Sequence, residues 1–261
     1  MKNFKRPWLK FASLKGVEVR KKMRAKQESE IKAYVKKRLE SRDTYRLLSR
    51  LCGFIMGDGY LSIRREKGKK WFHHEISFYP DNIEVAELFR DTFKDIYKKE
   101  PSIKTLNNYF RVRVVSPVAC KHLSSFSKFS TLDWRIPDFV LKDNESKIEF
   151  LRAIFDCEGY VGKRNIQFQS VNREGIYQIK YLLMELGIIS SIYSYKRTNP
   201  RWNINYILVI SRRENIKKYA QTIGFNHPLK IIKLVDIAGV PERLMGQSRE
   251  LVSARTSRFD S

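Results

Sequence analysis

Two acidic residues that could act together lie one hundred positions apart, each near the end of a similar nine-residue segment. Leu51–Gly59 reads LCGFIMGDG and Leu151–Gly159 reads LRAIFDCEG, and a tyrosine comes directly after each segment. If both segments are helices that pack side by side, Asp58 and Glu158 meet at their C-terminal ends. Paired carboxylates with neighbouring carbonyl oxygens form a hard-oxygen site suited to Mg²⁺. In a basic protein such a site favours metal-assisted hydrolysis of phosphodiesters.

Small residues in the two segments support this pairing of helices. Gly53 and Gly57 are four residues apart and therefore share one helix face, which lets a second backbone approach closely. Glycine inside a helix costs about 1 kcal/mol relative to alanine, so two glycines indicate a structural reason. Gly59 and Gly159 are predicted to end the helices in the left-handed conformation. A single helix ending in Asp-Gly is ordinarily only a capped helix, but its repetition favours a functional pair.

The net charge narrows the class of ligand. The 261 residues include 52 Lys and Arg against 28 Asp and Glu, a net charge of +24, which predicts binding to nucleic acid or to an anionic membrane. No apolar stretch approaches the ~18 residues of a membrane span, and no lipidation motif is present, so nucleic acid is favoured and no membrane partner is expected. Three widely spaced cysteines argue against a disulfide framework. They favour a reducing intracellular compartment, either an archaeal cytoplasm or an organelle.

The elements downstream of each acidic segment also repeat. After the first segment come a hairpin, a helix, a second hairpin and a short helix, predicted at 60–79, 81–97, 102–116 and after Pro117. After the second segment the same order is predicted at 159–170, 172–186, 191–211 and 214–223. Asp81 and Gly187 are the predicted first and last caps of the two central helices. Each half therefore reads α-β-β-α-β-β-α, which predicts an α/β protein of two pseudo-symmetric halves.

The repeat also predicts the domain boundaries. The two repeats occupy the middle of the chain, between a basic, largely helical extension and a basic tail. We expect the extension at 1–44, the first repeat at 45–135, a linker at 136–147, the second repeat at 148–235 and the tail at 236–261.

The two acidic segments resemble the motifs of a LAGLIDADG homing endonuclease in its single-chain, two-repeat form. IGFNHPLK, residues 223–230, resembles the close of the second repeat in that family. The resemblance covers about residues 45–235. It implies a monomer in which two four-stranded antiparallel sheets form a saddle over double-stranded DNA, with the motif helices at the interface. It also implies site-specific, intron-homing cleavage of a long asymmetric target with Mg²⁺, which Mn²⁺ or Ca²⁺ could replace for binding.

The resemblance assigns metal ligands to the acidic segments. Asp58 and Glu158 are the implied carboxylate ligands, and the carbonyl oxygens of Gly57 and Cys157 are implied to help them. Met56 departs from the motif, which has an acid there, although that position is not a metal ligand in the family. Polar accessory residues are expected at strand ends, where this chain has Phe78 and Tyr79 in the first half and Ser170 in the second.

A basic catalytic residue is implied in one half only. The central basic residue of the family falls on Arg113, whereas the same register in the second half lands on Val209, or on Leu208 if the alignment slips by one. Lys163 is the nearest replacement, but it comes from a different strand. We therefore expect two chemically unequal active sites.

Long polar side chains on the predicted strands are candidate DNA contacts. Arginine pairs well with guanine, and glutamine or asparagine pairs well with adenine. Lysines in a hairpin turn more often contact phosphates. The candidates are Arg64, Lys67, Lys69, Lys70, Lys104, Arg111, Arg113, Lys163, Arg164, Gln167, Gln169, Lys196, Arg197, Arg201, Asn203 and Asn205.

Two other functions are compatible with the same fold. An RNA maturase would bind its intron RNA, and a DNA-binding regulator would have lost catalysis. Because both acids are present, the regulator is disfavoured, while the maturase stays open as an alternative.

Overall fold

A computed structural model of the chain describes residues 41–65, 72–196 and 201–240, positions 68 and 199, and parts of the segment 16–34. The chain divides into two compact units, residues 1–41 and 42–261. In the first unit the described residues before Ser41 are helical. All elements discussed below belong to the second unit. None of the described helices is long and apolar enough to cross a membrane.

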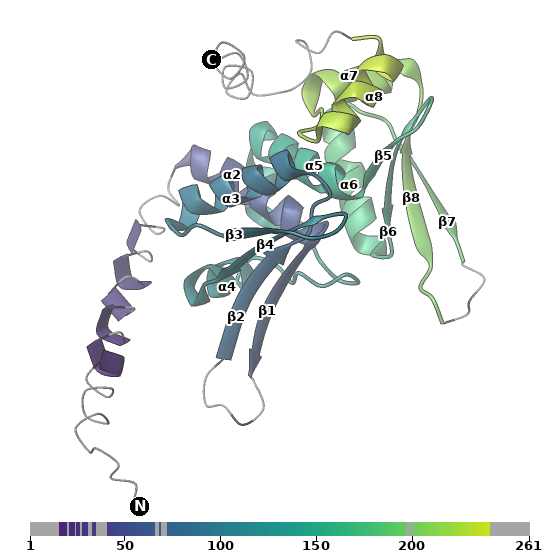
Figure 1. Ribbon diagram of the computed structural model, residues 1–261. Helices are drawn as coiled ribbons and strands as arrows, with labels where there is room; N and C mark the ends of the chain where they lie inside the picture. Colours follow the sequence, from purple (N-terminus) through teal and green to yellow (C-terminus); the bar gives the residue numbers. More distant parts are fainter. Residues whose placement is uncertain are drawn as a thin grey trace, which may run out of the picture. The chain divides into compact units, whose positions relative to one another are not determined.

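The second unit contains two copies of one element order, as predicted (Figure 1). The first copy consists of α2 (Arg42–Met56), β1 (Gly59–Arg65), β2 (Phe72–Phe78), α3 (Ile83–Tyr97), β3 (Ser102–Thr105), β4 (Phe110–Val115) and α4 (Pro117–Ser124). The second consists of α5 (Asn144–Glu158), β5 (Gly159–Val161), β6 (Ile166–Ser170), α6 (Arg173–Glu185), β7 (Ser191–Tyr195), β8 (Asn205–Ile210) and α7 (Arg213–Thr222). A short 3₁₀ helix, η1 (Asp138–Lys142), precedes α5, and α8 (Pro228–Ala238) comes after α7. Since α5 begins at Asn144, the segment 136–147 predicted as a linker includes its first turn.

Both copies form a four-stranded antiparallel sheet with the same topology. The strand orders are β1-β2-β4-β3 and β5-β6-β8-β7. Gly59 pairs with Phe78, and the equivalent Gly159 pairs with Phe168, which aligns the two sheets residue by residue. The α/β fold of two pseudo-symmetric halves is therefore confirmed.

Apolar residues alternate along the strands and pack against the helices. Ile76, Phe78, Val112 and Val114 are buried on one face of the first sheet, as the period of two along a strand requires. Phe54 of α2 contacts Phe78, with ring centroids 5.1 Å apart, so the first motif helix is part of this core. Phe155 of α5 packs on Phe168 in the same way, with centroids 5.1 Å apart. Each sheet thus fixes the motif helix of its own half.

Two predicted helix caps are wrong. Gly159 has φ −78° and ψ 137°, an extended conformation, and both Gly59 and Gly159 are the first residues of strands. Glycine is needed there because each strand turns back over the last turn of the motif helix. A Cβ atom would collide with Ile55 at the first glycine and with Phe155 at the second.

The N-terminal cap of α3 is also one residue later than predicted. Asn82, and not Asp81, caps the helix, because its Oδ1 atom accepts hydrogen bonds from the backbone N–H groups of Glu84 and Val85 at 2.8 and 3.2 Å. The side chain of Asp81 contacts His227 instead. At the other predicted cap, Gly187 has φ +70°, so glycine is favoured there for its conformation.

Candidate active site

The two motif helices, α2 and α5, pack directly against each other, as predicted from their small residues. A Cβ atom on Gly53 would lie 2.6 Å from the carbonyl oxygen of Phe150 and 2.9 Å from the Cβ atom of Ala153. A Cβ atom on Gly57 would collide with Cys157. The helices therefore approach most closely along these glycines, which brings their C-terminal ends together.

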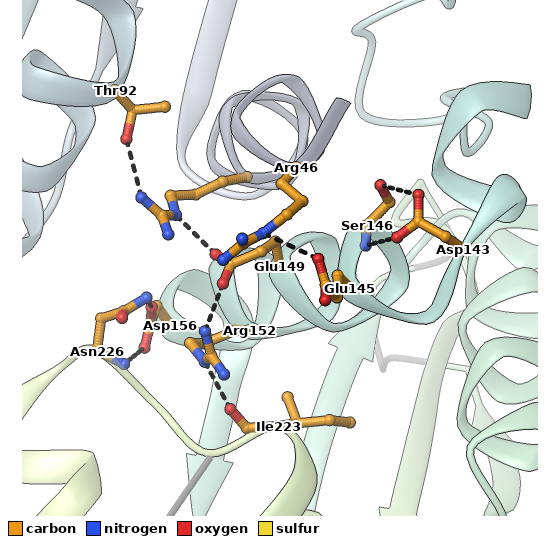
Figure 2. A network of polar contacts seen from close by, with 11 residues as sticks. Arg46, Thr92, Asp143, Glu145, Ser146, Glu149, Arg152, Asp156, Ile223 and Asn226 are labelled. Carbon is orange, nitrogen blue, oxygen red and sulfur yellow. Dashed lines mark hydrogen bonds and ion pairs between the residues drawn. The ribbon is translucent and has the colours of Figure 1, made fainter. Parts of the chain in front are cut away.

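A buried network of charges also joins the two helices, and it was not predicted. The Nε atom of Arg50 donates to Glu149 at 2.7 Å, and Nη1 of Arg152 donates to the other carboxylate oxygen at 2.7 Å. Figure 2 shows Glu149 and Arg152 in this network, with Arg152 also donating to the carbonyl oxygen of Ile223 at 2.6 Å. Burial alone would raise the pKa of Glu149, but the charges of Arg152 and Arg50 outweigh it and lower that pKa. A buried acid between two guanidinium groups is thus kept ionised.

The two acids of the motifs lie at the adjoining ends of the helices. Asp58 is in the turn after α2, and Glu158 is the last residue of α5. Burial raises the pKa of Asp58, and nearby Asp81 raises it further, while Lys230 lowers it. The pKa of Glu158 is raised to about 7 by desolvation and by the charge of Asp58, against a lowering by Lys230. The pKa of Glu158 thus responds to the charge of Asp58, as expected for carboxylates at the adjoining ends of two packed helices.

Near Asp58, the segment 223–230 closes over the end of α5. The Nζ atom of Lys230 donates to the carbonyl oxygens of Phe155, Asp156 and Cys157 at 3.2, 2.5 and 3.1 Å. The carboxylate of Asp156 accepts from the backbone and side-chain nitrogens of Asn226 at 2.8 and 2.7 Å (Figure 2). Lys230 therefore neutralises the negative end of the α5 dipole.

Near Glu158, a pocket lies beside the ends of the motif helices. Its lining includes Met56, Gly57 and Glu158 together with Gln169 and Asn205. Gly57 and Glu158, two of the four implied metal ligands, therefore face one cavity.

Two polar residues at this strand end, Gln169 and the predicted Ser170, line the pocket. The Oγ atom of Ser170 accepts from the backbone N–H of Asn172 at 3.1 Å and is committed to the turn before α6. Asn205, predicted as a DNA contact, is only 2 % exposed and supports other side chains instead. Its Nδ2 atom donates to Gln169 at 3.2 Å and to the hydroxyl of Tyr195 at 3.1 Å. Counting from the paired glycines, Gln169 corresponds to Tyr79 in the first half.

The two predicted basic catalytic residues lie in different surroundings, Arg113 on strand β4 and Lys163 in a loop. Arg113 pairs with Ser77 in the first sheet. Gln167, which corresponds to Ser77 in the second sheet, pairs with Val209, so the register that makes Val209 the counterpart of Arg113 is correct. Nη2 of Arg113 donates to Glu75 at 2.8 Å, which holds the guanidinium on the sheet face. Lys163 is exposed in the loop between β5 and β6.

The other predicted DNA contacts fall into three groups. Those of the first sheet share the face of Arg113, since Arg64 pairs with His73 and Lys104 pairs with Arg111. Those of the second sheet lie on β6 or on exposed turns, and these are Arg164, Gln167, Gln169, Lys196, Arg201 and Asn203. Four predicted residues lie outside the described part of the chain, namely Lys67, Lys69, Lys70 and Arg197.

The donor set at the helix ends fits a divalent cation. The carboxylates of Asp58 and Glu158 and the backbone carbonyls of Gly57 and Cys157 are hard oxygen ligands of the kind that Mg²⁺, Mn²⁺ and Ca²⁺ bind. Among the described residues no group of three or more His, Cys, Asp or Glu side chains forms a metal cluster. Carbonyl oxygens and a ligand such as a DNA phosphate would therefore have to complete the coordination.

Comparison with known proteins supports the relationship suggested by the motifs. Residues 145–224 match the family described as LAGLIDADG-like domain. The homing endonuclease I-DmoI in complex with DNA and Mn has a similar fold, with a TM-score of 0.56 and 19% identity over 69% of this chain and 97% of that chain. The same protein in complex with DNA and Ca gives a TM-score of 0.55 and 19% identity over 69% and 90% of the two chains.

The first curated relatives match this chain only over a small part of their own length. Glutamine–fructose-6-phosphate aminotransferase of Methanocaldococcus jannaschii is 29% identical over 72% of this chain, which spans 17% of that protein. The replication factor C small subunit of the same organism is 27% identical over 73% of this chain, which spans 10% of that protein.

Proposed function

We propose that this chain is a two-repeat LAGLIDADG protein and that it is a site-specific endonuclease that cuts both strands of DNA with divalent metal ions. One observation carries this proposal. Asp58 and Glu158 lie at the adjoining ends of α2 and α5, and the charge of Asp58 raises the pKa of Glu158. Two neighbouring acids would destabilise an ordinary helix end, whereas a metal site requires them.

The residues of the chain would divide the work between binding and chemistry. The carboxylates of Asp58 and Glu158, with the carbonyl oxygens of Gly57 and Cys157, would hold Mg²⁺. When bound, the metal supplies an activated water and neutralises charge on the scissile phosphate. Gln169, held by Asn205, faces the same pocket as Glu158 and would orient a water or a phosphate oxygen there.

The basic face of the first sheet would bind the DNA. Arg64, Lys104, Arg111 and Arg113 share this face, and a net charge of +24 favours a polyanion. Arg113 is held by Glu75, so its guanidinium is oriented before DNA arrives. This arrangement supports the use of Arg113 as the basic catalytic residue of the first half, with Lys163 as its replacement in the second.

The relatives support a function that belongs to the matching segment alone. They are named as an aminotransferase, a replication factor subunit, a DNA helicase and a tRNA-splicing ligase, and each match covers only 10 to 21% of the relative. Such names share no reaction or substrate. The segment that these relatives share with this chain would therefore have a function of its own, as expected of a homing endonuclease that spreads its own coding sequence.

The direct test is selection of cleaved sequences from a randomised pool of double-stranded DNA with Mg²⁺. We expect one long asymmetric target to be enriched. Asp58→Asn or Glu158→Gln should then abolish double-strand cleavage of that target while leaving its binding largely intact, because each removes metal charge but no groove contact. Asp236→Asn, which removes an exposed acid of α8, is the matched control and should cleave at the wild-type rate.

Other outcomes of this test identify the alternatives. Binding to a defined DNA site without cleavage in the wild type would indicate a regulator. Preferential binding to intron RNA, with faster splicing, would indicate an RNA maturase. Wild-type cleavage by Asp58→Asn or by Glu158→Gln would show that the assigned active site is wrong.

A further inference from the structure

The ammonium group of Lys230 lies at the C-terminal end of the motif helix α5. It lies in the first turn of α8, behind Pro228, and its Nζ atom donates to three successive carbonyl oxygens of α5. The last four carbonyls of a helix have no partner within the helix, and their partial negative charge attracts cations. Lys230 satisfies three of these groups with one ammonium group.

The position of Lys230 is fixed by contacts with both halves of the molecule. Asn226 and His227 donate backbone hydrogen bonds to Asp156 at 2.8 and 3.1 Å. Nε2 of His227 lies 3.0 Å from Oδ1 of Asp81, which precedes α3 in the first half. The His227 side of this contact is buried, whereas the Asp81 side chain is largely exposed. The segment 226–230 is thus anchored before it delivers the lysine.

This arrangement makes the two halves of the active site unequal. Met56 occupies in the first motif the position of Asp156 in the second, and its thioether cannot anchor a segment as a carboxylate does. Lys230 interacts electrostatically with both acids and lowers the pKa of each. Only the carbonyl of Cys157, however, is a hydrogen-bond acceptor of Lys230 among the four implied metal ligands.

The carbonyl oxygen of Cys157 therefore has two competing uses. It is one of the four implied metal ligands, in a residue that interacts with Asp58, and it accepts a hydrogen bond from an ammonium group 3.1 Å away. A divalent cation bound to that oxygen would lie close to a positive charge, and like charges at short range repel strongly where water is scarce. Gly57 and Glu158, by contrast, line the pocket beside the helix ends.

We propose that Lys230 is a positioning residue that makes the two metal positions unequal, so that the Asp58–Cys157 side binds a divalent cation more weakly than the Glu158–Gly57 side. The inference rests on the proposed function, because it takes these four residues as metal ligands. Its consequence is that metal ions bind in order. The Glu158–Gly57 side binds the first cation, and the ammonium group of Lys230 stabilises the charge of the Asp58–Cys157 side until a second cation binds there.

The test uses the full-length, metal-free protein and Mn²⁺ alone, with electron paramagnetic resonance to measure the free ion. The wild type should show two classes of site that differ about tenfold or more in affinity, since a unit charge a few ångströms away easily accounts for that ratio. Lys230→Met should strengthen the weaker class about tenfold and so merge the two. Lys230→Arg should keep them apart. Lys233→Met, which removes an exposed lysine of the same helix, should change neither class.

A second arm does not depend on the folding of any Lys230 variant. Asp58→Asn should remove the weaker class of sites, and Glu158→Gln should remove the tighter class. The opposite assignment, a single class in the wild type, or unchanged affinities in a folded Lys230→Met protein would overturn the inference. Two unequal classes without DNA cleavage would instead refute the proposed function and leave the role of Lys230 standing.

Discussion

Glu75 organises the basic face of the first sheet at the scale of single residues. Its carboxylate accepts from Nη2 of Arg113 at 2.8 Å and from the hydroxyl of Ser77 at 3.0 Å, and it lies 2.7 Å from Nε2 of His73. The hydrogen bond from Arg113 is the main reason why the pKa of Glu75 is lowered to about 2. A single acid on a basic surface therefore determines how a proposed catalytic arginine is presented.

The lowered pKa of Glu75 predicts a pH-dependent contribution to stability. A carboxylate with a folded-state pKa of about 2, against 4.5 when unperturbed, stabilises the fold above pH 4.5 and loses this effect as the pH falls toward 2. Glu75→Gln should lower the free energy of unfolding by roughly 1–3 kcal/mol at pH 7 and by progressively less toward pH 3. Urea unfolding at several pH values measures this. Glu174→Gln, which breaks an exposed pair with Arg135, should have little effect, and an equal loss from Glu75→Gln at pH 7 and pH 3 would contradict the assignment.

The strand register predicts a bias between the two DNA strands. Arg113 has Val209 as its counterpart in the second half, where the proposed replacement, Lys163, lies in the loop between β5 and β6. Arg113→Ala should slow the cleavage of one strand more than the other, and Lys163→Ala should show the opposite bias. Time courses with each strand labelled separately would show which nick comes first. Equal slowing of both strands by both variants would sink this prediction.

At the scale of the element, close contact between α2 and α5 is the feature most readily predicted from the sequence. Gly53→Ala tests it, because alanine in a helix is ordinarily more favourable than glycine by about 1 kcal/mol. Here the added methyl group would lie 2.6 Å from the carbonyl oxygen of Phe150, so we expect destabilisation by about 1–3 kcal/mol instead. Cleavage should fall as well, since the two acids separate. A higher melting temperature for Gly53→Ala than for the wild type would show that the helices are not in contact there.

The sheets carry different side chains and should prefer different half-sites. The polar face of the first sheet presents Arg64, Lys104 and Arg111, whereas the equivalent face of the second presents Tyr193 and Gln167. Arginine favours guanine, and glutamine with apolar contacts favours adenine and thymine. The selected target should therefore be richer in G·C pairs under the first sheet. Arg111→Gln should relax the preference in that half-site only, and a change confined to the other half-site would contradict this assignment.

The repeat predicted the elements well, but local rules misplaced some of their ends. Motif spacing and strand alternation are local patterns, so α2, α5 and both sheets could be predicted, as could the place of Asp58 and Glu158 at the ends of the two motif helices. The roles of Glu149, Asp156 and Lys230 could not, because each depends on partners about 70 to 100 residues away. Asp156 is the clearest example, since an acid at that motif position gives no sign in the sequence that it binds Asn226.

At the scale of the whole molecule, the excess of positive charge predicts how binding responds to salt. Each phosphate that the protein neutralises releases counterions, so the logarithm of the affinity falls by about 0.9 per phosphate for each unit in the logarithm of salt concentration. With a net charge of +24, we expect the affinity for the selected target to fall by an order of magnitude or more for each few-fold rise in KCl. Fluorescence anisotropy with labelled DNA across a salt series measures the slope. A nearly flat slope would indicate that the basic sheet face does not contact the backbone.

Both motifs belong to one chain, and this predicts the stoichiometry of the complex. The α2–α5 contact already joins two halves with the same topology, so one protein molecule contains both acids and both sheets. A symmetric dimer would need this contact between two copies, but here it is satisfied within the chain. We therefore expect one protein per DNA duplex and a target without a palindrome, since the two sheets differ in their side chains. Sedimentation of the complex with labelled DNA measures the stoichiometry, and an obligate dimer on a palindromic site would show that the two halves do not act as one unit.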